Sequence, residues 1–200
     1  MIDDPIQSSR VLVRFVRNEV ALRRSAGLSQ RDLAHRAGLH RSAISLIERY
    51  QRMPRLGTIV RISGAVESDQ WELLHGLKWD LGPELDWWRP SAEPCDRQVS
   101  AGPRVIVASP APRFGLLLAR QRLREDLTQV DVARICQMHS SEVSKIERGE
   151  REPWLDSLLQ LAAAVKIAPG DLLGGVHWLP GSSPFVAGYR ARSRTVWAAA

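Results

Sequence analysis

The chain has 200 residues, of which 44% are hydrophobic and 25% are charged, a balance typical of globular proteins. It contains no run of 18 or more apolar residues, and its first ten residues lack the pattern of a signal peptide, so we expect a cytoplasmic protein without membrane contact. The formal net charge of +6 favours a polyanionic partner.

An internal repeat organises the chain. The stretch that begins at Leu28 matches the stretch that begins at Leu127 without a gap, at an offset of 99 residues. About 19 of 52 matched positions are identical, far above the roughly three expected by chance. The repeat predicts two domains, at residues 10–80 and 113–178, with a proline-rich linker at 81–112 and a tail at 179–200.

Apolar periodicity and capping residues predict five helices in each copy. In the first copy we expect helices at about 10–26, 29–37, 41–49, 56–66 and 69–77. The second copy repeats this plan, with helices at about 114–125, 128–136, 140–148 and 154–165 and a short one from 169. The predicted fold class is all-α, with a short β extension after each copy. We also expect Trp79 and Trp178, which match across the repeat, to pack against their own domains.

A composite motif occurs once in each copy. It reads Leu-Ser-Gln, Asp-Leu-Ala, Ile-Ser-Leu-Ile-Glu-Arg and Arg-Met-Pro between Leu28 and Pro54, and Leu-Thr-Gln, Asp-Val-Ala, Val-Ser-Lys-Ile-Glu-Arg and Arg-Glu-Pro between Leu127 and Pro153. Both copies thus resemble the helix-turn-helix domain of the lambda Cro and repressor family, the XRE type. The first copy departs from the family pattern at Tyr50, where a glycine is usual, and the second at Gln137, which matches the turn glycine Gly38.

The resemblance implies that the third helix of each copy enters the major groove of double-stranded DNA. The residues expected to face bases are Arg41, Ser42, Ser45 and Leu46 in the first copy and Ser140, Ser141, Ser144 and Lys145 in the second. Those expected to face the DNA backbone are Gln30, Arg49 and Arg52, with Gln129, Arg148 and Arg151. The family also pairs a first-helix arginine with the motif glutamate, which implies Arg23–Glu48 and Arg122–Glu147 ion pairs.

The two base-facing sets differ, so the copies should prefer different DNA sequences. Arg41 can make a bidentate contact with guanine, and Lys145 can donate to guanine as a point charge. The target therefore need not be a palindrome. The resemblance predicts a transcriptional regulator in which two copies in one chain act as a covalent pseudo-dimer, although family members also form homodimers.

Two alternatives to DNA binding are a protein-interaction module and an enzyme. One copy could be a protein-interaction or dimerisation module, as in an antitoxin-like regulator, and the first copy is the suspect because Leu46 and Tyr50 are apolar at its third helix. An enzyme is disfavoured because we find no nucleophile elbow, phosphate-binding loop or metal-ligand cluster. The sequence indicates no cofactor and no metal. We interpret His40 and His139 as turn or capping residues and Cys136 as a packing residue.

Overall fold

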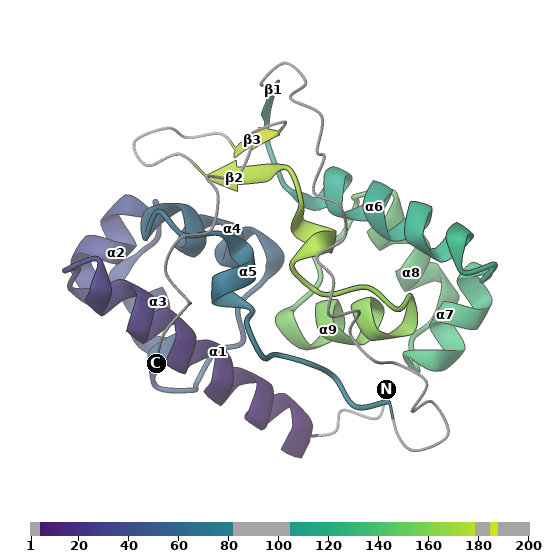
Figure 1. Ribbon diagram of the computed structural model, residues 1–200, viewed down its shortest axis with the longest axis horizontal. Helices are drawn as coiled ribbons and strands as arrows, with labels where there is room; N and C mark the ends of the chain where they lie inside the picture. Colours follow the sequence, from purple (N-terminus) through teal and green to yellow (C-terminus); the bar gives the residue numbers. More distant parts are fainter. Residues whose placement is uncertain (1–4, 82–104, 179–184, 188–200) are drawn as a thin grey trace, which may run out of the picture.

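The computed structural model describes residues 5–81, 105–178 and 185–187, and two groups of helices lie side by side in it (Figure 1). Domain 1 consists of α1 (Pro5–Ser25), α2 (Gln30–Arg36), α3 (Arg41–Glu48), α4 (Leu56–Ala65) and α5 (Gln70–Leu73). Domain 2 consists of α6 (Ala111–Arg124), α7 (Gln129–Ile135), α8 (Ser140–Glu147), α9 (Leu155–Ala164) and the 3-10 helix η2 (Asp171–Leu173). The all-α class is therefore confirmed. Among the described residues, no helix is long and apolar enough to cross a membrane.

Three short strands form one antiparallel sheet in the order β1-β3-β2. They are β1 (Val105–Val107), β2 (Val176–Trp178) and β3 (Phe185–Ala187), and Ala187 pairs with Val105 on one side and Val176 on the other. The β extensions that we expected to be separate thus join in a single sheet. The rest of the predicted linker and tail, residues 82–104, 179–184 and 188–200, lies outside the described residues.

Local capping explains where the second helix of each domain begins. The Ser29 hydroxyl accepts a hydrogen bond from the Asp32 amide, and the Asp32 carboxylate accepts one from the Ser29 amide in return. Thr128 and Asp131 form the same capping box in domain 2. These hydrogen bonds satisfy amides that have no partner within the helix. The Ser29 and Thr128 hydroxyls also donate to the two carboxylates, and these bonds, together with those from the Ser29 and Thr128 amides, lower the pKa of both aspartates.

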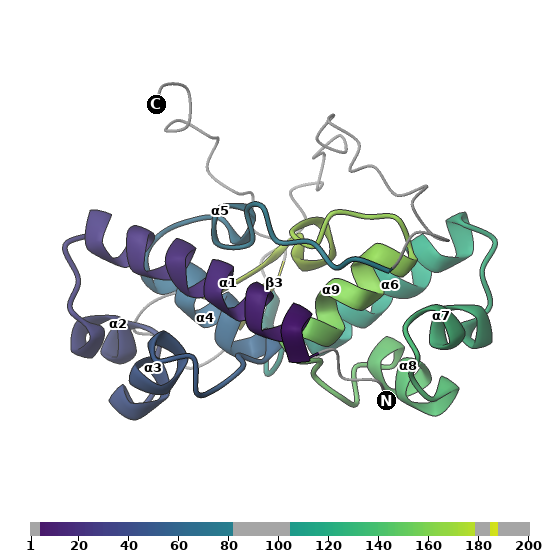
Figure 2. The same ribbon diagram turned by 90° about the horizontal axis from the view of Figure 1, so that it is seen from below.

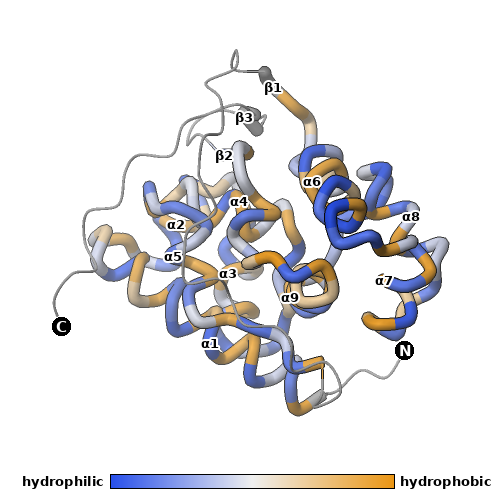
Figure 3. Tube along the Cα trace, turned by 45° about the vertical axis from the view of Figure 1, so that its right-hand side comes forward, coloured by the Kyte–Doolittle hydropathy of each residue, from blue (hydrophilic) through white to orange (hydrophobic). Residues whose placement is uncertain are grey.

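A single hydrophobic core runs through both domains. Phe15, Ile44 and Ile59 are buried in domain 1, and Phe114 and Val143 are buried in domain 2. In Figure 3, hydrophobic and hydrophilic positions alternate along the outer helices, as expected for helices with one buried face. Because the core is continuous, the two domains hold each other in a fixed orientation.

The interface between the domains has approximate two-fold symmetry. The Leu56 amide donates to the Pro153 carbonyl at 3.0 Å, and the Leu155 amide donates to the Pro54 carbonyl at 3.0 Å. The two bonds are equivalent in the repeat, because Leu56 and Pro54 of the first copy match Leu155 and Pro153 of the second copy, 99 residues later. Arg55 and Trp154, which also match, form a β-bridge, and the Arg55 guanidinium lies 4.1 Å from the centre of a Trp154 ring. The domains therefore meet as the halves of a dimer would, around an axis beside this bridge.

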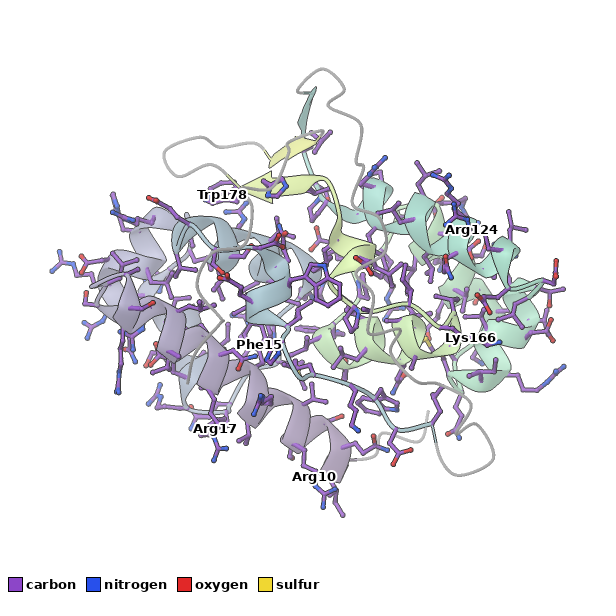
Figure 4. All side chains as sticks on the ribbon, in the orientation of Figure 1. Arg10, Phe15, Arg17, Arg124, Lys166 and Trp178 are labelled. Carbon is purple, nitrogen blue, oxygen red and sulfur yellow. The ribbon has the colours of Figure 1, made fainter. Side chains whose placement is uncertain are left out.

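The prediction that Trp178 packs against its own domain is wrong. Its indole Nε1 donates to the Arg36 carbonyl at 3.0 Å, and the Arg61 guanidinium lies 4.3 Å from its ring centre. A Cβ on Gly64 would lie 2.2 Å from the Trp178 carbonyl oxygen, so α4 must present a glycine there. Figure 4 shows Trp178 on β2, beside domain 1. The end of domain 2 thus crosses to domain 1 and covers apolar surface of α4.

Candidate nucleic-acid interface

The two helix pairs α2–α3 and α7–α8 lie along the same edge of the molecule, at opposite ends of it (Figure 2). Helices α1, α5, α6 and α9 lie above them in this view, away from that lower edge. Each third helix packs inward through two buried residues, Ile44 and Ile47 in α3 and Val143 and Ile146 in α8. The sides of α3 and α8 opposite these buried residues are therefore available to contact another molecule.

A buried ion pair ties each third helix to the first helix of its domain. Arg23 Nε lies 2.9 Å from Glu48 Oε1, and Arg23 Nη1 donates to the Leu28 carbonyl at 2.8 Å. In domain 2, Arg122 Nε lies 2.6 Å from Glu147 Oε1, and Arg122 Nη1 donates to the Leu127 carbonyl at 2.8 Å. The hydrogen bonds that Arg122 donates to Glu147 raise the pKa of the Arg122 guanidinium. The pairs orient α3 and α8 rather than facing solvent.

Each motif glutamine joins the same network. Gln30 Nε2 donates to Glu48 Oε2 at 2.9 Å, and Gln129 Nε2 donates to Glu147 Oε2 at 2.7 Å. The amide group therefore holds the start of α2 or α7 against the following helix. This position brings the first turn of α2 and of α7 to the same edge as the third helices, where we expected DNA backbone contacts (Figure 2).

The residues expected to face bases begin each third helix. Arg41 and Ser42 are exposed, whereas Ser45 and Leu46 are half-buried. His40 caps α3: its Nδ1 accepts from the Ser42 amide and lies 2.6 Å from the Ser42 hydroxyl oxygen. In domain 2 the exposed residues are Ser140, Ser141 and Lys145, and Ser144 is half-buried. The first turns of α3 and α8 therefore present donors of different shape and charge.

The arginines after each third helix, Arg49, Arg52, Arg148 and Arg151, are all exposed. The structure adds residues that motif reasoning missed. Arg31 is exposed in the first turn of α2, and Glu142 and Glu150 lie beside the domain 2 arginines. The alignment of the two copies could have revealed the two glutamates, because the matching residues of domain 1, Ala43 and Gln51, are uncharged.

Comparison with family models agrees with this geometry. A helix-turn-helix model matches residues 21–67, from the end of α1 through α4, and a second helix-turn-helix domain model matches residues 113–173, from α6 through η2. The chain is a tandem helix-turn-helix protein of the Cro and repressor type. Neither curated proteins nor solved structures gave a match. The two domains of this tandem helix-turn-helix protein support DNA binding and a role in transcription regulation.

Over the described ranges, no group of three or more His, Cys, Asp or Glu side chains could hold a metal ion. Cys136 is buried, and burial raises the pKa of its thiol to about 12, which keeps the thiol protonated and unreactive at neutral pH.

Proposed function

We propose that one chain of this protein binds double-stranded DNA with both third helices and regulates transcription by reading two unlike half-sites. The observation that carries the proposal is the placement of α3 and α8 on one edge of a body with a continuous core (Figure 2). A two-fold arrangement of this kind matches two successive major grooves on one side of a duplex, about 10 base pairs apart.

In this arrangement the backbone contacts come from Gln30, Gln129 and the arginines that follow each third helix, and the base contacts come from the first turns of α3 and α8. If about six phosphates are neutralised, the logarithm of the affinity should fall with the logarithm of salt concentration with a slope near −5. Selection of bound duplexes from a random pool should return two different half-sites at one constant spacing. Recovery of a single short site, or of a symmetric palindrome, would contradict the proposal.

Arg41 provides the sharpest test of base reading. The Arg41→Ala variant should relax base preference at one position of the domain 1 half-site and weaken binding to the selected sequence by about 1–3 kcal/mol. Binding to a mixed-sequence duplex should change much less. Selection and titration with both proteins measure this, and an unchanged motif would show that α3 does not read bases through this side chain.

A second candidate function is that one domain binds another protein. Three apolar side chains of domain 2 favour it, since Leu116, Leu123 and Val130 are 58%, 63% and 55% exposed. Footprint length distinguishes the two functions: two DNA-binding domains protect two adjacent major-groove sites, and one domain protects only one.

A further inference from the structure

The DNA-facing segments of the two domains carry opposite formal charge. Residues 41–55, which span α3 and the following turn, contain four arginines and one glutamate, a formal charge of +3. The matching residues 140–154 contain three basic residues and four glutamates, a formal charge of −1. Phosphate contacts depend on positive charge, so segments of equal shape have unequal attraction for a duplex.

In domain 2 the arginines are already paired with carboxylates. Arg148 makes a two-point contact with Glu150, with Nε–Oε1 at 2.6 Å and Nη2–Oε2 at 2.9 Å, and its Nη1 also donates to the Ser144 hydroxyl at 2.5 Å. The hydrogen bond from Arg148 lowers the pKa of Glu150, which keeps that carboxylate charged at neutral pH. Arg151 pairs with Glu142 of α8 itself.

Among the residues that the structure describes, the matching arginines of domain 1, Arg49 and Arg52, have no carboxylate partner. Arg49 Nε donates to the Ser45 backbone carbonyl at 3.2 Å. Within the described part of the chain, no carboxylate lies within ion-pair distance of Arg41, Arg49 or Arg52. The first turn of α2 adds Arg31, where α7 has the apolar Val130.

We propose that domain 1 supplies most of the affinity for the DNA backbone, and that domain 2 is a weaker reader restrained by its own glutamates. This inference rests on the proposed function. When domain 2 meets a duplex, Arg148 and Arg151 exchange a carboxylate for a phosphate, and Glu142 and Glu150 are left close to the phosphate charge. The repulsion offsets the new contacts, whereas the domain 1 arginines bind phosphate without giving up a carboxylate.

The test removes the two carboxylates without changing side-chain size. The Glu142→Gln/Glu150→Gln variant is compared with Glu72→Gln/Glu125→Gln, which changes net charge equally on α5 and after the end of α6, away from the α3 and α8 edge (Figure 2). Binding to a mixed-sequence duplex of about 30 base pairs is measured by fluorescence anisotropy over a range of salt concentrations. The first variant should bind about tenfold more tightly at moderate salt, with a slope steeper by about 1–2, and the control should change by about twofold or less.

The reverse exchange applies to domain 1. The Ala43→Glu/Gln51→Glu variant should lose about tenfold in affinity for the same duplex, because it places the domain 2 carboxylates beside Arg49 and Arg52. Circular dichroism and thermal unfolding verify that each variant is folded. The inference is overturned if the native chain binds in a salt-dependent way but the Glu142→Gln/Glu150→Gln variant behaves like the control. A native chain that binds no duplex at low salt would overturn the proposed function itself.

Discussion

Domain 1 and domain 2 share one framework but differ on the surface that surrounds it. Arg23 and Arg122 hold equivalent glutamates in equivalent ways. Outside that framework, the exposed Leu116, Leu123 and Val130 of domain 2 match arginines 17, 24 and 31 of domain 1. Figure 4 shows Arg17 on the outer side of α1, pointing away from the body. The two domains thus share a scaffold, but the surface of domain 1 is more basic. The surface of domain 2 is more apolar, and its arginines form ion pairs with its own glutamates.

The domains also differ in how closely the first and third helices approach. A Cβ on Gly115 of α6 would lie 2.4 Å from the carbonyl oxygens of Ile146 and Glu147, so α6 and α8 are in backbone contact. The matching residue of α1 is Val16, whose side chain is buried. The first and third helices therefore lie in closer backbone contact in domain 2 than in domain 1.

The largest expected effect comes from breaking the contact that joins the unlike domains. Trp178→Ala removes the buried indole that packs against Gly38 and Arg61, and it should lower the free energy of unfolding by about 3–5 kcal/mol. Calorimetry should show one unfolding transition for the native protein, because its domains share a core, and two transitions for the variant. The reason is that domain 1 loses the Trp178 side chain that covers its apolar surface.

A graded variant sharpens this test. Trp178→Phe keeps most of the ring but loses the hydrogen bond to the Arg36 carbonyl, and it should cost about 1 kcal/mol. If Trp178→Ala unfolds at the native temperature in one transition, the contact with α4 does not couple the domains.

A buried carboxyl gives domain 1 a source of pH dependence that the matching position of domain 2 lacks. Glu19 is fully buried, and neither of its carboxylate oxygens has a hydrogen-bond partner among the described residues; the matching residue of domain 2 is Leu118. Burial and, to a lesser extent, the nearby Glu48 raise the pKa of Glu19 from 4.5 to about 8, although Arg23, 3.6 Å away, opposes the shift. The folded state retains this proton longer than the unfolded state, so stability should fall as pH rises from about 4.5 to about 8.

Exchange of the matched residues tests this. Glu19→Leu should flatten the pH dependence of unfolding and raise stability at pH 8 by on the order of a few kcal/mol. Leu118→Glu should transfer the same sensitivity to domain 2 and should destabilise the protein more at pH 8 than at pH 5. Urea unfolding at a series of pH values measures both effects. An unchanged slope in Glu19→Leu would mean that another group titrates.

The parts of the molecule that sequence reasoning predicted are those determined by neighbours along the chain. Ser29 and Thr128 locate the starts of α2 and α7 because a capping box involves residues only three apart. The ranges of the third helices follow equally from local periodicity and from the repeat. The fifth element differs from the prediction in both domains: α5 ends at Leu73, before the predicted end near 77, and the helix expected from 169 is a 3-10 helix over Asp171–Leu173.

The remaining features depend on packing between distant segments. Trp178 contacts the Arg36 carbonyl, 142 residues earlier in the chain, and periodicity carries no information about such a contact. The Arg151–Glu142 pair spans a helix and the turn after it, so its formation depends on the turn geometry. The sequence gives the number of charged residues at the candidate interface, but it does not show which of them form ion pairs with each other.

The smallest expected effect concerns the residue that follows the third helix. Tyr50 has a φ of +61°, a left-handed conformation that favours glycine, and the matching residue of domain 2 is Gly149, with a φ of +72°. Tyr50→Gly removes the strain of a side chain in this conformation, and this gain exceeds the entropy that a glycine adds to the unfolded state. Thermal unfolding should show stabilisation by about 0.5–1 kcal/mol, a rise of about 2–3 °C in Tm.

The reciprocal change should have the opposite sign and a larger size. A Cβ on Gly149 would lie 2.6 Å from the Cα of Pro112, so Gly149→Ala adds a steric clash to the conformational strain and should cost about 2 kcal/mol. A lower Tm for Tyr50→Gly would mean that the half-exposed Tyr50 ring contributes packing that outweighs the strain. In that case the two turns, although equal in backbone conformation, would be stabilised by different forces.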